Sequence, residues 1–122
     1  MTSHNRVLGQ WGESLAADHL ARQGFDIIAR NFRTPYGEID LIAQNAQFLV
    51  FVEVKTRSAD TYGFPEASIT RQKREHLIAS AQAYLQAHPE IICPWRIDVI
   101  AIRKQRDAEP EIIHFENALT AP

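Results

Sequence analysis

The sequence predicts an α/β protein in which helices cover a mixed β-sheet. Two segments place apolar residues at helical spacing, and four or five others are short, rich in β-branched and aromatic residues, and bounded by turn residues. The predicted order is helix, three strands, helix, and one or two strands. This order is typical of a covered mixed sheet of the α/β class, with α+β as the alternative.

The first half of the chain predicts a helix, a strand and a turn. Apolar residues recur at helical spacing over residues 7–23, and Gly24 follows as a C-terminal stop. Residues 25–32 are predicted to form a strand, and residues 35–37 a turn. The helical stripe consists of Leu8, Trp11, Leu15 and His19, with Ala16 and Leu20 beside it.

A β-hairpin is predicted next, because two strong strand segments, 38–43 and 48–55, are separated by only four residues. The second half begins with a long loop over residues 57–67. A helix capped by Ser68 or Thr70 then runs to about Ala87. Residues 95–102 are apolar on both faces, which predicts a strand inside a covered sheet, and residues 112–115 predict a last short strand.

Length and composition predict one domain over residues 1–122, with no signal peptide and no membrane span. The single cysteine, Cys93, cannot form an internal disulfide, so a cytoplasmic protein is expected. The net charge is −2, so any nucleic-acid binding must be local. Basic residues do gather in the middle of the chain, although ordinary surface fluctuation would also explain them: Arg30, Arg33, Lys55, Arg57, Arg71, Lys73 and Arg74.

The predicted hairpin carries charges where a buried strand should have none. Glu53 and Lys55 are two residues apart, so they share a strand face, and Glu38 and Asp40 do the same on the other strand. If Ala43 pairs with Phe48, Asp40 lies opposite Phe51 and Glu38 lies opposite Glu53. All four charges then share one face.

Clustered carboxylates favour a hard divalent cation, Mg²⁺ or Mn²⁺. We expect Asp40, Glu53 and the carbonyl of Val54 to bind it, with Lys55 orienting a water molecule or stabilising developing negative charge. Metal-dependent nucleases of the PD-(D/E)xK class have the layout found here, which is Asp40, twelve intervening residues, and then Glu53-Val54-Lys55. The alternative is an internal salt bridge between Glu53 and Lys55.

Two longer blocks carry a resemblance to a known family. The chain resembles the YraN-like family of small bacterial predicted endonucleases, related to archaeal Holliday-junction resolvases. This resemblance implies a restriction-endonuclease-like α-β-β-β-α-β core with Asp40, Glu53 and Lys55 as catalytic residues. It also implies that Glu13 is a helix-borne acid near the metal, the alternative being a solvated surface acid. The residues that match are Gly12-Glu13, Arg30-Asn31, the block over 37–43, the block over 51–57, Lys73, and the segment 96–99.

Several other residues are assigned provisional roles. Arg57, Lys73 and Arg74 are candidate phosphate contacts, with Arg33 at their border. Glu38 either binds a second metal ion or caps the turn after Gly37. Asp98 is expected to be a buried structural acid paired with Arg96 or with an amide. The five histidines show no metal-ligand spacing.

The sequence therefore predicts a metal-dependent DNA endonuclease that acts on branched or structured DNA. Two alternatives stay open: a nucleic-acid-binding module with a nuclease fold but little catalysis, and a structural protein whose acids and Lys55 form a salt-bridge network. Cutting both strands at a branch would require two active sites, which hints at a homodimer.

Overall fold

The computed structural model describes residues 3–58 and 69–119. In that part of the chain, helices and strands follow the predicted order, and they confirm the α/β class. The predicted loop over 57–67 and Ser68 lie almost entirely outside the described residues. The elements are α1 (Ser3–Arg22), β1 (Asp26–Thr34), β2 (Gly37–Gln44), β3 (Leu49–Arg57), α2 (Arg71–Ala87), β4 (Trp95–Arg103) and β5 (Glu111–Leu119).

One sheet of five strands, in the order β1-β2-β3-β4-β5, forms the centre of the molecule. Strands β3 and β4 are parallel, and the other neighbours are antiparallel. Parallel neighbours require a crossover connection, and α2 lies within it. Thr70 caps α2, since its hydroxyl accepts a hydrogen bond from the Lys73 amide. Neither described helix is long and apolar enough to cross a membrane.

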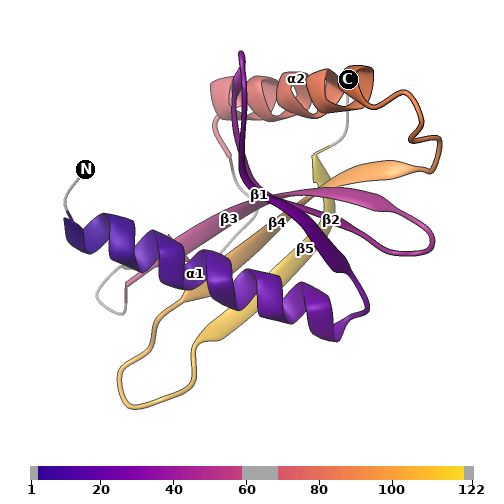
Figure 1. Ribbon diagram of the computed structural model, residues 1–122. Coiled ribbons are helices and arrows are strands. Elements are labelled where there is room, and N and C mark those ends of the chain that lie inside the picture. Colours follow the sequence, from indigo (N-terminus) through magenta and orange to yellow (C-terminus); the bar gives the residue numbers. More distant parts are fainter. Residues whose placement is uncertain (1–2, 59–68, 120–122) are drawn as a thin grey trace.

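The two helices cover opposite faces of the sheet (Figure 1). Leu20 on α1 packs with Val52 and Ile100, whereas Leu77 and Tyr84 on α2 belong to the core that contains Phe51 and Ile97. Strands β3 and β4 are therefore buried on both faces, which explains their nearly continuous apolar sequence.

The β2–β3 register differs from the predicted one by two residues. Ala43 pairs with Val50 rather than with Phe48. The last pair before the turn is Gln44 with Leu49, so each side of the turn lies one residue later in the sequence than in the predicted pair of Ala43 with Phe48. The Asn45 carboxamide accepts hydrogen bonds from the Gln47 and Phe48 amides, which includes Phe48 in the turn. A shift of two residues keeps every side chain on its predicted face, since the strand period is two.

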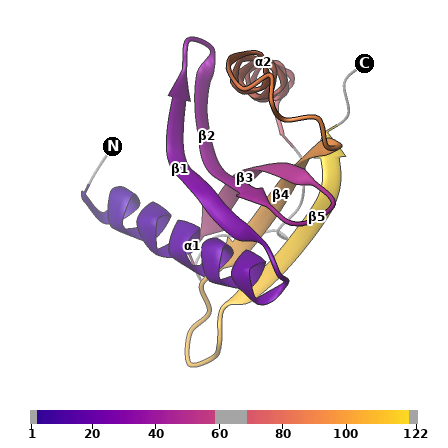
Figure 2. The same cartoon turned by 45° about the vertical axis from the view of Figure 1, so that its right-hand side comes forward.

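The β1–β2 hairpin bends out of the sheet and rises beside α2 (Figure 2). At its outer end the Thr34 hydroxyl lies 2.8 Å from the Ser80 hydroxyl of α2. The ladder between β2 and β3 runs only as far as the pair of Leu41 and Val52. Beyond that pair the two strands diverge, and Asp40 is the first β2 residue in the opening.

Strand lengths also differ from those predicted. The last strand extends to Leu119, because β5 pairs with β4 from Glu111 opposite Arg103 to Leu119 opposite Ile97. An irregularity between Ile97 and Val99 interrupts this pairing, and on β5 Asn117 adopts a left-handed φ of 50°. This irregularity adds two residues to β5 relative to β4, which period-two patterning does not show.

Gly12 determines how closely α1 approaches β3. A Cβ atom on Gly12 would lie 2.0 Å from the Thr56 hydroxyl oxygen and 3.0 Å from the Thr56 Cβ, so only glycine fits. At Gly9, one turn earlier on the same helix, no atom of the described residues lies within 4 Å of such a Cβ atom. The close approach at Gly12 places the next residue, Glu13, over the opening between the strands.

We expect Gly12→Ala to destabilise the protein by about 1–3 kcal/mol, because the added methyl forces α1 away from β3. Gly9→Ala should be neutral or stabilising by up to about 1 kcal/mol, since alanine favours helix. Urea denaturation of both variants measures the difference. Adding Thr56→Ala to Gly12→Ala should recover part of the loss, and equal stability of the two single variants would contradict the close-approach argument.

Candidate functional site

Asp40 and Glu53 meet where β2 leaves β3. Continued by one residue, the observed register places them side by side. Their carboxyl groups lie close enough to interact directly. Asp40 Oδ2 also accepts a hydrogen bond of 2.8 Å from the Val54 amide, so a side chain replaces the main-chain partner that β2 no longer provides.

Burial makes this pair of carboxyl groups electrostatically costly. Glu53 is only 8% exposed, and burial followed by the nearby Asp40 raises its pKa to about 7. Burial also raises the pKa of Asp40, although the hydrogen bond from Val54 opposes that change. The Oε2 atom of Glu53 is buried and accepts no hydrogen bond from the residues that the structure describes. At neutral pH the pair therefore favours a shared proton or a cation.

Lys73 supplies part of the missing positive charge. Its Nζ lies 3.4 Å from Glu53 Oε1, reaching across from the first turn of α2. This contact lowers the pKa of Glu53 but does not outweigh burial and Asp40. Lys73, predicted as a phosphate contact, thus lies beside the carboxylates themselves.

Glu13 reaches the same site from α1. Burial and, next, the charge of Asp40 raise the pKa of its carboxyl group. With the nitrogen of its amide facing the acids, Asn31 donates hydrogen bonds to Glu13 Oε1 at 3.2 Å and to Glu38 Oε1 at 3.0 Å. Asn31 therefore holds together two carboxylates that would otherwise repel each other.

Sequence reasoning missed Asn31 as a site residue. Its φ of 50° is left-handed and unusual within a strand, and it lies next to Asp40 in the continued β1–β2 register. Asparagine is disfavoured in strands, so its presence in this otherwise apolar or basic strand segment is the sequence feature that could have identified Asn31 as a site residue. Backbone of this kind gathers at functional sites.

Two clefts adjoin the carboxylates. One, of about 550 Å³, lies between α1 and the β1–β2 hairpin, and its walls include Arg6, Gln10, Glu13, Asn31, Arg33 and Glu38. The other, of about 420 Å³, lies between β3 and the start of α2, and its walls include Glu53, Lys55, Arg57, Thr70 and Lys73. Arg74 borders a separate hollow with Ile69 and Ile78.

The structure thus brings Glu13, Asp40, Glu53 and Lys73 together, with Lys55 and Arg57 along one cleft and Arg33 and Glu38 along the other. The exposed Arg33 lies 3.7 Å from Glu38, a contact worth little in water. Within residues 3–58 and 69–119, no three carboxylate, imidazole or thiolate groups converge as a complete metal site. A cation here would rely on two carboxylates plus other oxygen atoms, as Mg²⁺ commonly does.

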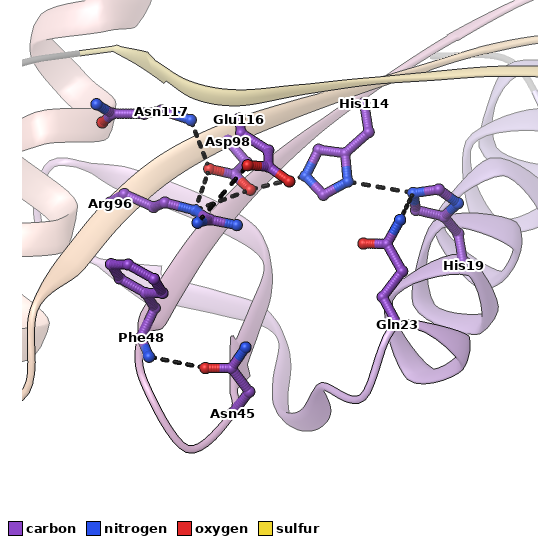
Figure 3. Close-up of polar contacts among 9 residues, drawn as sticks. All are labelled: His19, Gln23, Asn45, Phe48, Arg96, Asp98, His114, Glu116 and Asn117. Carbon is purple, nitrogen blue, oxygen red and sulfur yellow. Dashed lines mark hydrogen bonds and ion pairs between the residues drawn. The ribbon is translucent and has the colours of Figure 1, made fainter.

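A second polar network lies at the other end of α1 (Figure 3). The fully buried Asp98 accepts hydrogen bonds from the Arg96 side chain at 3.0 Å and the Asn117 amide at 2.9 Å. The Arg96 guanidinium also lies over the Phe48 ring, 4.8 Å from its centroid. These contacts confirm that Asp98 is a buried acid paired with Arg96 and with an amide.

Sequence comparison relates residues 12–102 to the family described as "Uncharacterised protein family UPF0102". A UPF0102 protein of Syntrophotalea carbinolica is 42% identical over 97% of this chain and 95% of its own length. One of Roseiflexus castenholzii is 48% identical over 84% of this chain and 83% of its own. A structure of Pyrococcus furiosus SfsA in complex with Ca²⁺ aligns with a TM-score of 0.43 and 19% identity. The alignment covers 96% of this chain and 65% of the SfsA chain.

The raised pKa of Glu53 predicts a pH dependence of stability in the metal-free protein. Its pKa is about 7 when folded and 4.5 ordinarily, so the folded state binds the proton more tightly. The free energy of unfolding should therefore fall as the pH rises from about 4.5 to about 7, by at most about 3 kcal/mol. Urea denaturation in a chelator should show a flatter profile for Glu53→Gln than for the parent. The exposed-acid control Glu75→Gln should keep the parental slope, and an unchanged slope in Glu53→Gln would contradict the assignment.

Proposed function

The chain belongs to the UPF0102 family, and we propose that it is a metal-dependent nuclease that hydrolyses phosphodiester bonds in DNA. One observation carries the proposal: the carboxyl group of the buried Glu53 adjoins that of the half-buried Asp40, and its Oε2 atom accepts no hydrogen bond from any residue that the structure describes. A structural site would gain by pairing that atom, whereas a cation-binding site leaves it available. The family membership agrees with the YraN-like resemblance, and the relationship to nucleases and resolvases is part of this proposal.

The residues present fit Mg²⁺ or Mn²⁺. Asp40 and Glu53 would provide carboxylate oxygens, and the Val54 carbonyl would provide a third. The Val54 amide points at Asp40, and within a strand the amide and carbonyl of one residue face the same neighbour. The carbonyl is therefore directed towards the same opening. A bound ion would supply positive charge beside a phosphate and lower the pKa of water.

Hydrolysis requires a water oxygen to attack phosphorus while one bridging P–O bond breaks and the leaving oxygen gains a proton. Lys55 borders the cleft that Glu53 lines, which suits it to orient that water or to stabilise charge on the phosphate oxygens. Glu13, whose pKa is raised, is suited to hold water near the ion from the other side. Lys73 balances the carboxylates when no ion is bound.

DNA is the proposed substrate, and branched DNA is the preferred form. Arg57 and Lys73 border the cleft beside Glu53, and Arg33 borders the opposite one, so a phosphate backbone would meet positive charge on both sides of the carboxylates. A chain of net charge −2 depends on such a local patch. Two copies would be needed to cut both strands, so a homodimer is included in the proposal.

One observation favours a purely structural role instead. The ion pair between Lys73 and Glu53 is what a salt-bridge network would contain, although the predicted partner was Lys55. Metal binding separates the two functions, because a structural network has no affinity for Mn²⁺.

Asp40→Asn should weaken Mn²⁺ binding at least about tenfold, since even loss of an outer-shell partner commonly costs about 10–100-fold. The fold should persist, because the amide oxygen of asparagine can still accept the Val54 hydrogen bond. Isothermal titration calorimetry measures the affinity. An unchanged affinity would remove Asp40 from the metal site.

Lys55→Ala should reduce DNA cleavage by roughly 10²–10³-fold, while DNA affinity changes little. Cleavage is measured on a panel of branched and linear DNAs with Mg²⁺. Lys104→Ala is the matched control, because the Lys104 ammonium lies over Trp11 instead. Full cleavage by folded Lys55→Ala would exclude a required catalytic role for this lysine.

Reversing the charge of Arg33 and Arg57 together should weaken DNA binding and make its salt dependence shallower, by the equivalent of about two phosphate contacts. Lys73 is left intact because it touches Glu53, so Mn²⁺ affinity should stay nearly unchanged. The double variant Arg22→Glu with Arg106→Glu changes the net charge by the same amount and serves as the control. Parental DNA affinity in the Arg33 and Arg57 variant would show that the patch lies elsewhere.

A further inference from the structure

Two histidines far apart in the sequence meet where the last turn of α1 lies beside β5 (Figure 3). His19 Nε2 lies 3.1 Å from His114 Nδ1, and the rings stand edge to face at 66°. We propose that this pair binds a divalent first-row transition metal, represented by Zn²⁺. The site is separate from the carboxylates of Asp40 and Glu53, and the proposal does not depend on the nuclease function.

Asp98 determines which nitrogen of His114 is available. Its Oδ2 lies 2.7 Å from His114 Nε2, while the Arg96 side chain and the Asn117 amide also donate to its carboxylate. A carboxylate that accepts from these donors is ionised, so His114 Nε2 carries the proton that it donates. In the neutral ring, Nδ1 then holds a lone pair directed at His19. A carboxylate behind a histidine in this way is the usual support of a metal ligand.

The other side of the pair also presents a lone pair. Gln23, four residues after His19, places its amide nitrogen 3.2 Å from His19 Nε2. An amide N–H only donates, so in this arrangement His19 Nε2 acts as an acceptor. In this tautomer the lone pairs of His19 Nε2 and His114 Nδ1 face each other, and a shared proton or a cation makes that contact favourable. Burial, followed by the nearby His114, lowers the pKa of His19 and so favours the neutral ring that a metal requires.

The spacing suits a tetrahedral ion. Zn–N bonds of about 2.0–2.1 Å place two ligand nitrogens roughly 3.3–3.4 Å apart. The observed 3.1 Å requires an opening of only a few tenths of an ångström. Imidazole ligands select Zn²⁺, Ni²⁺ or Cu²⁺ over Mg²⁺, which prefers oxygen. Water and the rotated Gln23 amide oxygen would complete the coordination, since His19 is partly exposed.

Zinc calorimetry on the full chain, with millimolar Mg²⁺ present to occupy the carboxylates, tests the proposal. The parent should bind one Zn²⁺ and should melt at a higher temperature when zinc is added. His19→Gln should weaken this binding at least about tenfold, because it keeps an amide for hydrogen bonding but supplies no imidazole. His76→Ala, at an exposed position on α2, is the matched control and should bind like the parent.

His114→Ala provides a second variant, and its circular dichroism shows whether the fold survives the loss of a buried side chain. Asp40→Asn should leave this zinc site intact while weakening the carboxylate site, so the two metal proposals fail independently. Zinc affinity unchanged in His19→Gln, or zinc binding abolished by Asp40→Asn alone, would overturn the histidine site.

Discussion

The repulsion between the carboxyl groups of the half-buried Asp40 and the buried Glu53 is the constraint on which the site depends. Asp40 and Glu53 adjoin at the point where β2 and β3 separate, and water is largely excluded from Glu53. Placing charges of one sign together in a buried position is unfavourable unless a cation or a proton intervenes. Burial and then this juxtaposition raise the pKa of Glu53, and the Nζ atom of Lys73 lies beside the same carboxyl group.

The surrounding backbone maintains that juxtaposition. The β1–β2 hairpin bends towards α2, which opens the ladder at Asp40 and leaves the Val54 amide for its side chain. Gly12 allows α1 to lie against Thr56, so that Glu13 comes over the opening. Asn31, in a left-handed conformation, then bridges Glu13 to Glu38. Each of these features costs some local stability, and each serves to position a carboxylate.

The two ends of α1 present different chemistry. Near its start, oxygen ligands and cationic side chains suit a hard ion and a phosphate. Near its end, imidazole nitrogens backed by Asp98 suit a softer ion. A metal bound by His19 and His114 would link α1 to β5 across 95 residues of sequence, and it would hold the helix that also carries Glu13.

The sequence by itself determined the elements, their order and the faces of the strands. Local spacing identified α2 and its Thr70 cap, and the period of two placed Glu53 and Lys55 on one face even though the predicted register was displaced by two residues. Only the tertiary structure decided which groups meet: Lys73 with Glu53, Asn31 with Glu13, and His19 with His114. Periodicity follows from the geometry of a single strand or helix, whereas these contacts depend on strand bending, a bulge and helix packing between segments far apart in the chain.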